Sequence, residues 1–211
     1  FCGPDKLALC RRLKLVGSNT TGNAHIDVNY ARAKGLTVIT LRAYPEFLDT
    51  ITSTAELTLG LIIALTRNLV PATFSVTGNG RWERWPFGGD RMLCRMSLGV
   101  IGLGRLGYKT ATYASSFGMA VRYYDPYVTT EDPRFAKLGS LAELVAASDI
   151  VSLHVPHQPD TENLVDGHLL SQFKASAYFV NTSRGELVDE AALLAALESG
   201  QLAGAAVDVL N

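Results

Sequence analysis

The stretch LGVIGLGRLG, residues 98–107, indicates which kind of fold this chain adopts. Its first four residues form an apolar run typical of a buried strand, and the spacing G-x-G-x-x-G then falls at Gly102, Gly104 and Gly107. The first glycine permits a tight turn, the second lets the backbone approach a pyrophosphate, and the third lets helix and strand pack closely. Because the spacing alone is a weak signal, its place between a predicted strand and a predicted helix carries the interpretation.

Apolar runs and helical segments alternate regularly from this stretch to the end of the chain. We expect strands at residues 98–101, 120–124, 149–155, 177–180 and 205–209, and helices near 105–117, 141–147, 166–173 and 190–199. Ser140 and Asp189 are expected to cap two of these helices. Strands separated by helices predict an α/β fold with a doubly wound parallel sheet, a Rossmann domain over residues 51–211.

An acidic residue ends the strand after the glycine-rich loop. Asp125 follows Gly102 by 23 residues, close to the roughly 20 at which an acid accepts hydrogen bonds from the adenosine ribose. The backbone amides of Arg105 and Leu106, at the positive end of the helix, would point at the phosphates. A carboxylate repels a 2′-phosphate, which favours NAD over NADP, although Arg122 nearby blurs that preference. The alternative is a glycine-rich packing turn with an aspartate on the surface.

The first 50 residues predict a small part of another α/β domain. We expect strands at residues 13–16 and 36–39, joined by a helix that Asp27 caps and that stops at Gly35. This unit is too small to have a core of its own. Residues 1–50 therefore look like the C-terminal part of a smaller α/β domain, which the family resemblance given below implies is a flavodoxin-like substrate domain.

A very apolar helix is expected to connect the two domains. Ser53-Thr-Ala-Glu56 has the spacing of a capping box, and the helix that follows, to about Asn68, is apolar almost all round. Such a helix is typically buried on several sides, as between domains or subunits. The segment TGNGRWERWPFGG, residues 77–89, is then either a packed loop or an arm exchanged across a dimer.

The composition is typical of a well-packed soluble protein. Of 211 residues 47% are hydrophobic and 18% are charged, and the net charge is −1, so we expect neither disorder nor a nucleic-acid partner. Three cysteines without C-x-x-C spacing favour free thiols in a reducing compartment, and hence the cytoplasm. The most apolar stretch, residues 57–65, is too short to span a bilayer, and we expect no membrane partner and no metal site. Because both ends look cut, we expect a fragment.

Several motifs spread over nearly the whole chain point to one family when they are taken together. They are TTGNAHID (20–27), STAELTLGLIIALTRN (53–68), GVIGLGRLG (99–107), YYDP (123–126), SLHVP (152–156), NTSRGELVDEAAL (181–193) and LESGQLAGAAVDV (197–209). The sequence resembles the NAD-dependent D-2-hydroxyacid dehydrogenases, in particular their phosphoglycerate dehydrogenase-like members. This resemblance implies an oxidoreductase that transfers a hydride between NAD and a small 2-hydroxy or 2-oxo acid, usually as a homodimer.

Arg184 lies directly after a predicted strand, in the sequence NTSRG. The resemblance implies that this arginine binds the carboxylate, and often the carbonyl oxygen, of a 2-oxo acid, which makes it the candidate catalytic residue. A guanidinium group matches a carboxylate bidentately and polarises the carbonyl that receives the hydride. The alternative is a surface salt bridge to Glu186 or Asp189.

A turn near the start of the chain is the second candidate for substrate binding. Thr21, Gly22 and Asn23 match the turn whose backbone amides hold the substrate carboxylate in the family. The alternative is a polar turn chosen for its glycine. The family has an acid two residues after this glycine, where this sequence has Ala24, so only the backbone donors are carried over.

Five further positions match cofactor contacts of the family. The resemblance implies that Val155 and Pro156 line the adenosine side and that Thr182 and Ser183 pass the nicotinamide ribose. Asp208 matches the acid that accepts from the carboxamide and so selects the nicotinamide face. For Asp208 the alternative is a plain carboxylate at the end of a strand.

The family's proton donor is a histidine assisted by a glutamate, and both are expected beyond residue 211. We expect the four histidines of this chain (25, 154, 157 and 168) to be structural, with His154 considered as a substitute acid. Two rival functions stay open. One is an NAD(H)-sensing co-repressor on the same fold, and the other is a different Rossmann enzyme, such as an alanine dehydrogenase or an adenosylhomocysteinase. The order of residues 181–185 and 204–208 argues against the latter.

Overall fold

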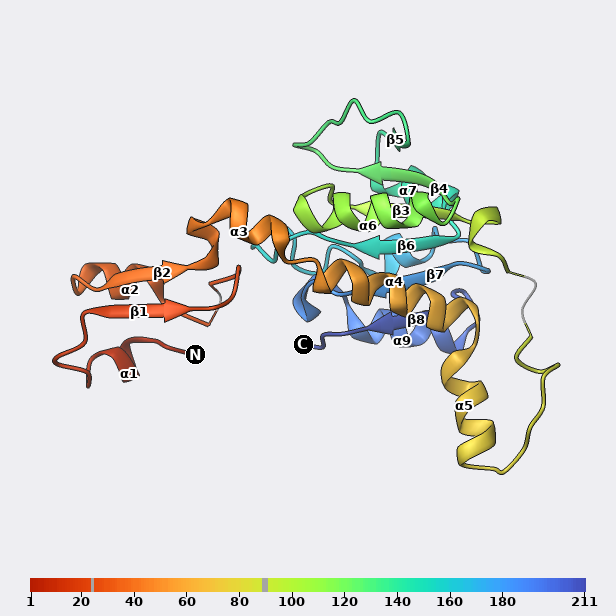
Figure 1. Cartoon of the computed structure of the whole chain (residues 1–211), viewed down its shortest axis with the longest axis horizontal. Coiled ribbons are helices and arrows are strands. Elements are labelled where there is room, and N and C mark those ends of the chain that lie inside the picture. The colour runs from red at the N-terminus through yellow and green to blue at the C-terminus, as the bar shows by residue number, and fades with distance from the viewer. Residues whose placement is uncertain (24, 89–90) are drawn as a thin grey trace. The chain divides into compact units, whose positions relative to one another are not determined.

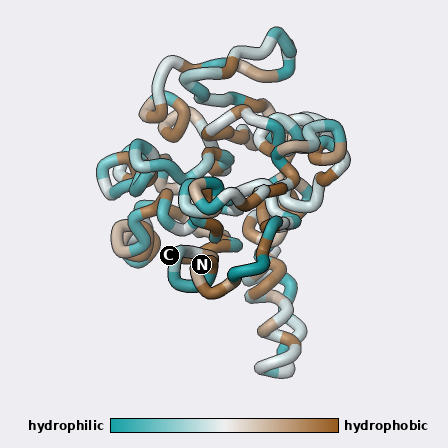
Figure 2. The backbone as a smooth tube through the Cα atoms, turned by 90° about the vertical axis from the view of Figure 1, so that its left-hand side faces the viewer, coloured by the Kyte–Doolittle hydropathy of each residue, from teal (hydrophilic) through white to brown (hydrophobic). Residues whose placement is uncertain are grey.

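The computed structural model of this chain describes residues 1–23, 25–88 and 91–211 (Figure 1). The chain divides into two compact units, Phe1–Thr52 and Ser53–Asn211. Most of the buried hydrophobic side chains belong to the second unit. Coloured by hydropathy, the backbone shows hydrophobic (brown) stretches interspersed with hydrophilic (teal) ones (Figure 2).

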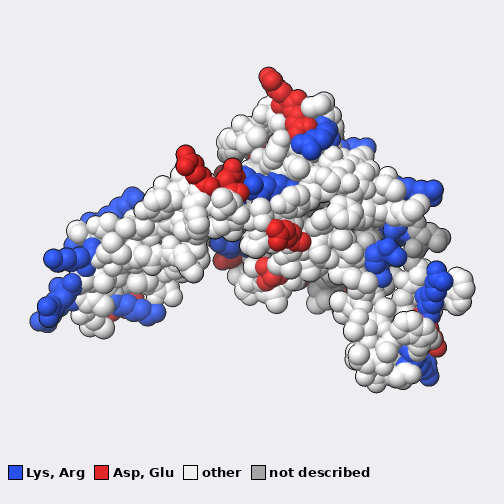
Figure 3. Space-filling view, viewed as in Figure 1, with Lys and Arg blue, Asp and Glu red and all other residues white. Residues whose placement is uncertain are grey.

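The first unit contains a two-stranded parallel sheet and several short helices, of which α2 joins the two strands. Its elements are α1 (Pro4–Leu7), β1 (Leu15–Ser18), α2 (Val28–Ala33), β2 (Thr37–Thr40), η1 (Leu41–Ala43) and α3 (Pro45–Thr50). Asp27 caps α2 as predicted, because its carboxylate accepts a hydrogen bond from the Tyr30 N–H at 2.8 Å. Gly35 follows the helix with a φ of +74°. Lysine and arginine side chains gather over this unit (Figure 3).

Six parallel strands form the sheet of the second unit, in the order β5-β4-β3-β6-β7-β8. They are β3 (Ser97–Ile101), β4 (Ala120–Tyr124), β5 (Phe135–Lys137), β6 (Ile150–Leu153), β7 (Tyr178–Asn181) and β8 (Gly204–Val207). The parallel α/β fold and its five expected strands are confirmed. The edge strand β5 was not predicted, since three residues with one buried side chain carry no alternating pattern.

Helices cover both faces of this sheet. The helices of the second unit are α4 (Ser53–Thr66), α5 (Leu69–Thr77), α6 (Arg105–Ser116), α7 (Leu141–Ala147), α8 (Gly167–Leu170) and α9 (Glu190–Glu198), with short turns η2 (Leu93–Arg95) and η3 (Gly185–Leu187), and all but α5 lie along the sheet (Figure 1). On one face Leu98 packs in a cluster with Ile62 of α4 and Ala111 of α6. On the other face Phe179 packs in a cluster with Leu144 of α7. The helix α5 was not predicted separately; it projects away from the sheet and carries hydrophobic residues (Figures 1 and 2).

The predicted caps of two helices are confirmed. Ser140 accepts a hydrogen bond from the Glu143 N–H at 3.1 Å, and the Glu143 carboxylate accepts from the Gly139 N–H at 3.0 Å. Asp189 accepts from the Ala192 N–H at 3.0 Å. The connecting helix differs by one residue, because α4 begins at Ser53 itself rather than after it.

Within this chain, the fully buried positions of the connecting helix form one stripe. The buried positions are Ala55, Thr58, Ile62 and Thr66, spaced by three or four residues, whereas Leu57 is 41% exposed. An apolar composition all round a helix does not say which side faces the sheet. By length and composition alone the segment Pro45–Thr66 is apolar enough to cross a membrane, yet α4 contributes to the packed core of the second unit.

Candidate active site

The carboxyl ends of five strands lie in register along one edge of the sheet. Paired across the strands are Tyr124, Ile101, Leu153, Asn181 and Val207. The residues directly after these ends are Asp125, Gly102, His154, Thr182 and Asp208. Open parallel sheets bind ligands in the crevice outside this edge. The fold therefore brings predicted cofactor residues from separate loops to one edge.

The loop after β3 turns sharply at Gly102. Its φ is +88°, in the left-handed region that favours glycine, and its N–H donates to the Tyr124 carbonyl oxygen at 2.9 Å. A Cβ at this position would lie 2.7 Å from Val155 Cγ1 and 2.9 Å from the His154 carbonyl oxygen. Only glycine fits here without movement of the loop after β6.

The two other glycines of the motif have different surroundings. A Cβ on Gly107 would collide with the Gly102 carbonyl oxygen, so this glycine lets α6 approach the strand closely. Gly104 precedes α6, and a Cβ there would meet no atom of the described residues within 4 Å. Open space at a helix N-terminus lets a phosphate reach the backbone amides of Arg105 and Leu106. The loop therefore fits the pyrophosphate of a dinucleotide.

Asp125 is buried and joins the end of β4 to the glycine-rich loop. Its Oδ2 accepts from the Leu103 N–H at 2.8 Å, and its Oδ1 accepts from Tyr127 and Val128 N–H groups at 2.8 and 2.9 Å. A carboxylate offers about four acceptor positions. A ribose hydroxyl can therefore still donate to Oδ2, while the backbone bonds hold the carboxylate at the loop.

The loop after β6 contains His154, half-buried Val155 and exposed Pro156. The His154 N–H donates to the Ile101 carbonyl oxygen at 2.8 Å, and the imidazole Nε2 lies 2.9 Å from Ser152 Oγ. Burial lowers the pKa of His154 to about 4. Its imidazole is therefore neutral at pH 7, which suits a structural residue better than a substitute acid.

Asn181, which sequence reasoning missed, braces the turn that carries Arg184. Its Nδ2 donates to the Arg184 carbonyl oxygen at 2.8 Å, and its Oδ1 accepts from the Ser183 N–H at 2.9 Å. The Ser183 hydroxyl donates to the Leu153 carbonyl oxygen at 2.7 Å. A buried asparagine at a strand end, followed by small polar residues, is the signal that points to such a local turn.

The side chain of Thr182 faces the helix α4. Thr182 is buried, and its Oγ1 lies 2.8 Å from Oγ1 of Thr58. A cofactor contact at this position would therefore come from the backbone, since the hydroxyl is already bonded to the helix.

The Arg184 side chain is exposed, and its Nη1 donates to the Ser183 carbonyl oxygen at 2.6 Å. Within the described ranges, no salt bridge joins it to Glu186 or Asp189. Asp189 instead caps α9. The guanidinium group therefore keeps donors available for an anionic ligand.

Asp208 lies at the same edge, directly after β8. Its N–H donates to the Asn181 carbonyl oxygen at 2.9 Å, and its side chain is exposed. This acid and the arginine turn are thus joined through one residue, Asn181.

The candidate substrate turn of the first unit follows β1. Thr21 is exposed, and the Gly22 carbonyl oxygen accepts from the Thr20 hydroxyl at 2.8 Å. The Asn23 Oδ1 is buried and has no hydrogen-bond partner in the part of the chain that the structure describes. The expectation about Ala24 lies outside the described residues.

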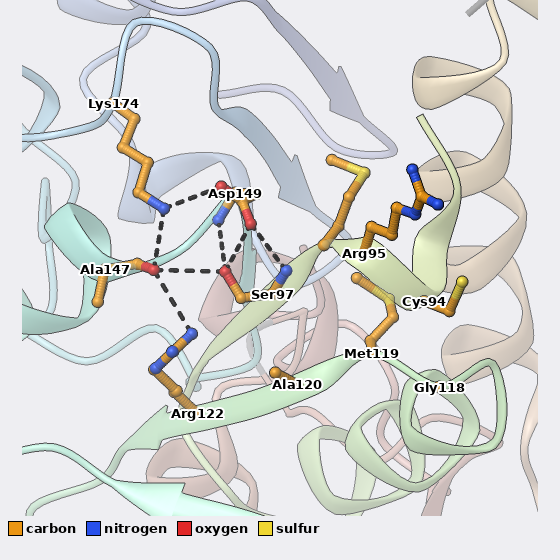
Figure 4. Close-up of a pocket in the computed structure, with 11 residues that line it drawn as sticks. Cys94, Arg95, Ser97, Gly118, Met119, Ala120, Arg122, Ala147, Asp149 and Lys174 are labelled. Carbon is orange, nitrogen blue, oxygen red and sulfur yellow. Dashed lines mark hydrogen bonds and ion pairs between the residues drawn. The ribbon is translucent and has the colours of Figure 1, made fainter. Parts of the chain in front are cut away.

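A hollow of about 480 Å³ lies at the opposite, amino end of the strands (Figure 4). Beside it, Asp149 Oδ1 lies 2.8 Å from Lys174 Nζ, and its Oδ2 accepts from the Ser97 hydroxyl at 2.8 Å. Lys174 and Arg122 also donate to the Ala147 carbonyl oxygen, at 3.1 and 3.5 Å. Burial favours the neutral acid, but the bonds from Lys174 and Ser97 hold the pKa of Asp149 below its ordinary value. These groups bond to one another, which indicates a structural network rather than a second ligand site.

A glycine-rich loop of this geometry, at the carboxyl edge of a parallel sheet, defines a dinucleotide-binding domain. The chain belongs to the D-isomer specific 2-hydroxyacid dehydrogenases, because the model of their NAD binding domain matches residues 59–211. This match confirms the predicted family and NAD as cofactor. It also decides against the other Rossmann enzymes considered.

Known relatives match almost all of this chain. The D-3-phosphoglycerate dehydrogenase of Methanocaldococcus jannaschii is 36% identical over 210 residues, 98% of this chain and 39% of that protein. The human D-3-phosphoglycerate dehydrogenase is 38% identical over 211 residues, 98% of this chain and 38% of that protein. The crystal structure of D-lactate dehydrogenase from Aquifex aeolicus, complexed with NAD and lactic acid, has a TM-score of 0.83 and 35% identity over 100% of this chain and 62% of that chain. The chain thus spans less than half the length of the two phosphoglycerate dehydrogenases.

Proposed function

We propose that the protein containing this chain transfers a hydride between NAD and a small D-2-hydroxy acid or the corresponding 2-oxo acid. The observation that supports it best is the exposed guanidinium group of Arg184, which no carboxylate of the described residues neutralises. It follows β7 at the sheet edge where the glycine-rich loop opens. NAD, when bound, accepts or supplies the hydride.

Arg184 is proposed to hold the substrate by its anionic group. Two parallel N–H donors of a guanidinium match a carboxylate, and a further donor can polarise the neighbouring carbonyl oxygen as negative charge develops there. Asn181 donates to the carbonyl oxygen of this arginine, so the backbone that carries the guanidinium group is held in place. This arrangement favours small substrates in which a carboxylate adjoins the reacting carbon.

The turn of Thr21, Gly22 and Asn23 is proposed to give backbone N–H groups to the same carboxylate. We assign residues 1–50 to the substrate domain and residues 51–211 to the NAD-binding domain. The Asn23 Oδ1, which is buried without a partner among the described residues, is available to a donor that the full protein or its ligand supplies.

Proton transfer is assigned to the histidine and glutamate expected beyond residue 211. The neutral His154 is bonded to Ser152, and the Nε2 of His25 lies 2.9 Å from the Ser18 hydroxyl, so both have structural partners. The cytoplasm is proposed as the compartment because all three cysteines are free thiols.

The test compares the full-length enzyme with its Arg184→Ala and Arg184→Lys variants on a panel of 2-oxo acids. Since hydrogen bonds to a charged group contribute roughly 1.5–3 kcal/mol, Arg184→Ala should raise KM for the oxo acid about 10- to 100-fold. Lysine should restore only part of the loss, because it lacks the planar fork. NADH affinity, measured by fluorescence titration, should change little.

Two outcomes would contradict this assignment. An equal loss of NADH affinity in Arg184→Ala would place the arginine at the cofactor rather than the substrate. A wild-type protein that binds NADH but reduces no 2-oxo acid would favour the NAD(H)-sensing co-repressor instead.

A homodimer is proposed through α5 and the segment that follows it. Phe74 is 62% exposed, Trp82 is 88% exposed and Trp85 is 86% exposed. Large apolar side chains that gather on a surface typically mark a protein interface. Sedimentation of the full-length protein should give a dimer, and the double variant Trp82→Ser/Trp85→Ser should give a monomer. A double variant that stays dimeric would exclude this segment from the interface.

A further inference from the structure

A buried hydrogen bond links the connecting helix to the turn that carries Arg184. Thr58 of α4 and Thr182 lie 124 residues apart in sequence, yet their hydroxyl oxygens lie 2.8 Å apart and both residues are buried. We propose that Thr58 is a positioning residue that holds Arg184 in place through Thr182. This inference rests on the proposed role of Arg184 in substrate binding.

The direction of this hydrogen bond follows from the number of protons. The Thr58 Oγ1 also lies 2.8 Å from the carbonyl oxygen of Thr54, one turn earlier in α4, and a carbonyl oxygen can only accept. The single hydroxyl proton of Thr58 is therefore donated to Thr54, so Thr182 must donate to Thr58. Because β-branched side chains have few rotamers, this bond holds Thr182 in one orientation.

The turn is fixed from three directions. Asn181 binds the Arg184 carbonyl oxygen within the turn, and Ser183 binds the end of β6. Thr182 provides the contact to α4. Loss of the Thr58 hydroxyl would remove one of these three contacts, so the backbone from which the Arg184 side chain extends could move. A misplacement of about 1 Å can cost roughly 100-fold in rate, so substrate use should suffer more than stability.

Thr66 offers a matched control on the same helix. It is 2% exposed, and its hydroxyl donates to the Ile62 carbonyl oxygen at 2.8 Å. Among the described residues its hydroxyl bonds only to α4 itself. Thr66→Val therefore removes the same chemical group from the same helix without releasing the Arg184 turn.

The experiment uses the full-length enzyme and the variants Thr58→Val, Thr58→Ser and Thr66→Val. For each, kcat and KM are measured with the best 2-oxo acid of the wild-type enzyme, together with the NADH dissociation constant and Tm. Thr58→Val should lower kcat/KM about tenfold, which is less than the roughly 100-fold loss from a 1 Å misplacement, and NADH binding should change little. Thr58→Ser keeps the hydroxyl and should retain most activity. Thr66→Val should lower Tm comparably but keep wild-type kinetics.

Wild-type kinetics in Thr58→Val, or the same kinetic loss in Thr66→Val, would overturn the inference. If Arg184→Ala is impaired while Thr58→Val is not, only the positioning role fails. If Arg184→Ala is unimpaired, the proposed function of the arginine fails as well. Should Thr58→Val not fold, Thr182→Val removes the donor from the other side and must show the same selective loss of kcat/KM, and wild-type kinetics in that variant overturn the inference.

Discussion

Gly104→Ala should weaken NADH binding while leaving the fold intact. Gly104 has φ −69° and ψ −169°, which alanine adopts without strain, and the added methyl meets no described atom within 4 Å. The free energy of unfolding should therefore change by less than about 0.5 kcal/mol. The methyl would occupy the space proposed for the pyrophosphate. If two charge-assisted hydrogen bonds of about 1.5 kcal/mol each are lost, the NADH dissociation constant rises about 100-fold.

Gly102→Ala provides the contrasting variant of the same loop. Its φ of +88° costs an L-residue about 1–2 kcal/mol, and the contact with Val155 adds to that. If these 211 residues unfold as one cooperative unit, their Tm should fall by roughly 2–8 °C. The assays are thermal unfolding and NADH fluorescence titration of the full-length protein. Wild-type NADH affinity in Gly104→Ala, or a Tm as low as that of Gly102→Ala, would refute the assignment of the open space to the cofactor.

Three further substitutions test charged and hydrogen-bonded groups. Asp125→Ala should relax the preference for NAD over NADP, measured as the ratio of kcat/KM values; an unchanged ratio would exclude the ribose contact. Lys174→Met should cost up to about 1 kcal/mol at pH 7. The lowered pKa of Asp149 stabilises the fold above pH 3.8, and this stabilisation is lost as the pH falls further. In urea titrations the free energy of unfolding of Lys174→Met should therefore fall less on acidification than that of the wild-type protein. The pKa of His154 is about 4 instead of 6.5, so on acidification the unfolded chain takes up this proton first. The free energy of unfolding therefore falls as the pH drops from 6.5 to 4. In His154→Gln the urea midpoint should depend less on pH over this window. A pH dependence of the midpoint equal to that of the wild-type protein would contradict the burial of the imidazole.

Features that depend on neighbours in sequence could be predicted from the residues alone. Asp27, Ser140 and Asp189 cap their helices as expected, because a cap requires only a side-chain acceptor and an N–H three residues later. The left-handed turn at Gly102 follows from the glycine spacing after an apolar strand.

Contacts between distant segments could not be predicted in this way. Thr58 and Thr182 are ordinary threonines in sequence, and only the packing of α4 on the sheet brings their hydroxyls together. The same holds for Asp149 and Lys174, which meet at the amino end of the strands although no local pattern pairs them. The role of Asn181 is local, but the sequence alone does not say which backbone groups of the turn its amide bonds.

The strand β6 separates β3, which carries the glycine-rich loop, from β7, which carries Arg184. Neighbouring strands are about 4.8 Å apart, so the two loops begin roughly 10 Å from each other. Backbone hydrogen bonds between strands set this interval, and no side-chain replacement in either loop alters it. Under the proposed function, substitutions near the arginine can change which organic acid is accepted, while the spacing that the dinucleotide must span stays constant.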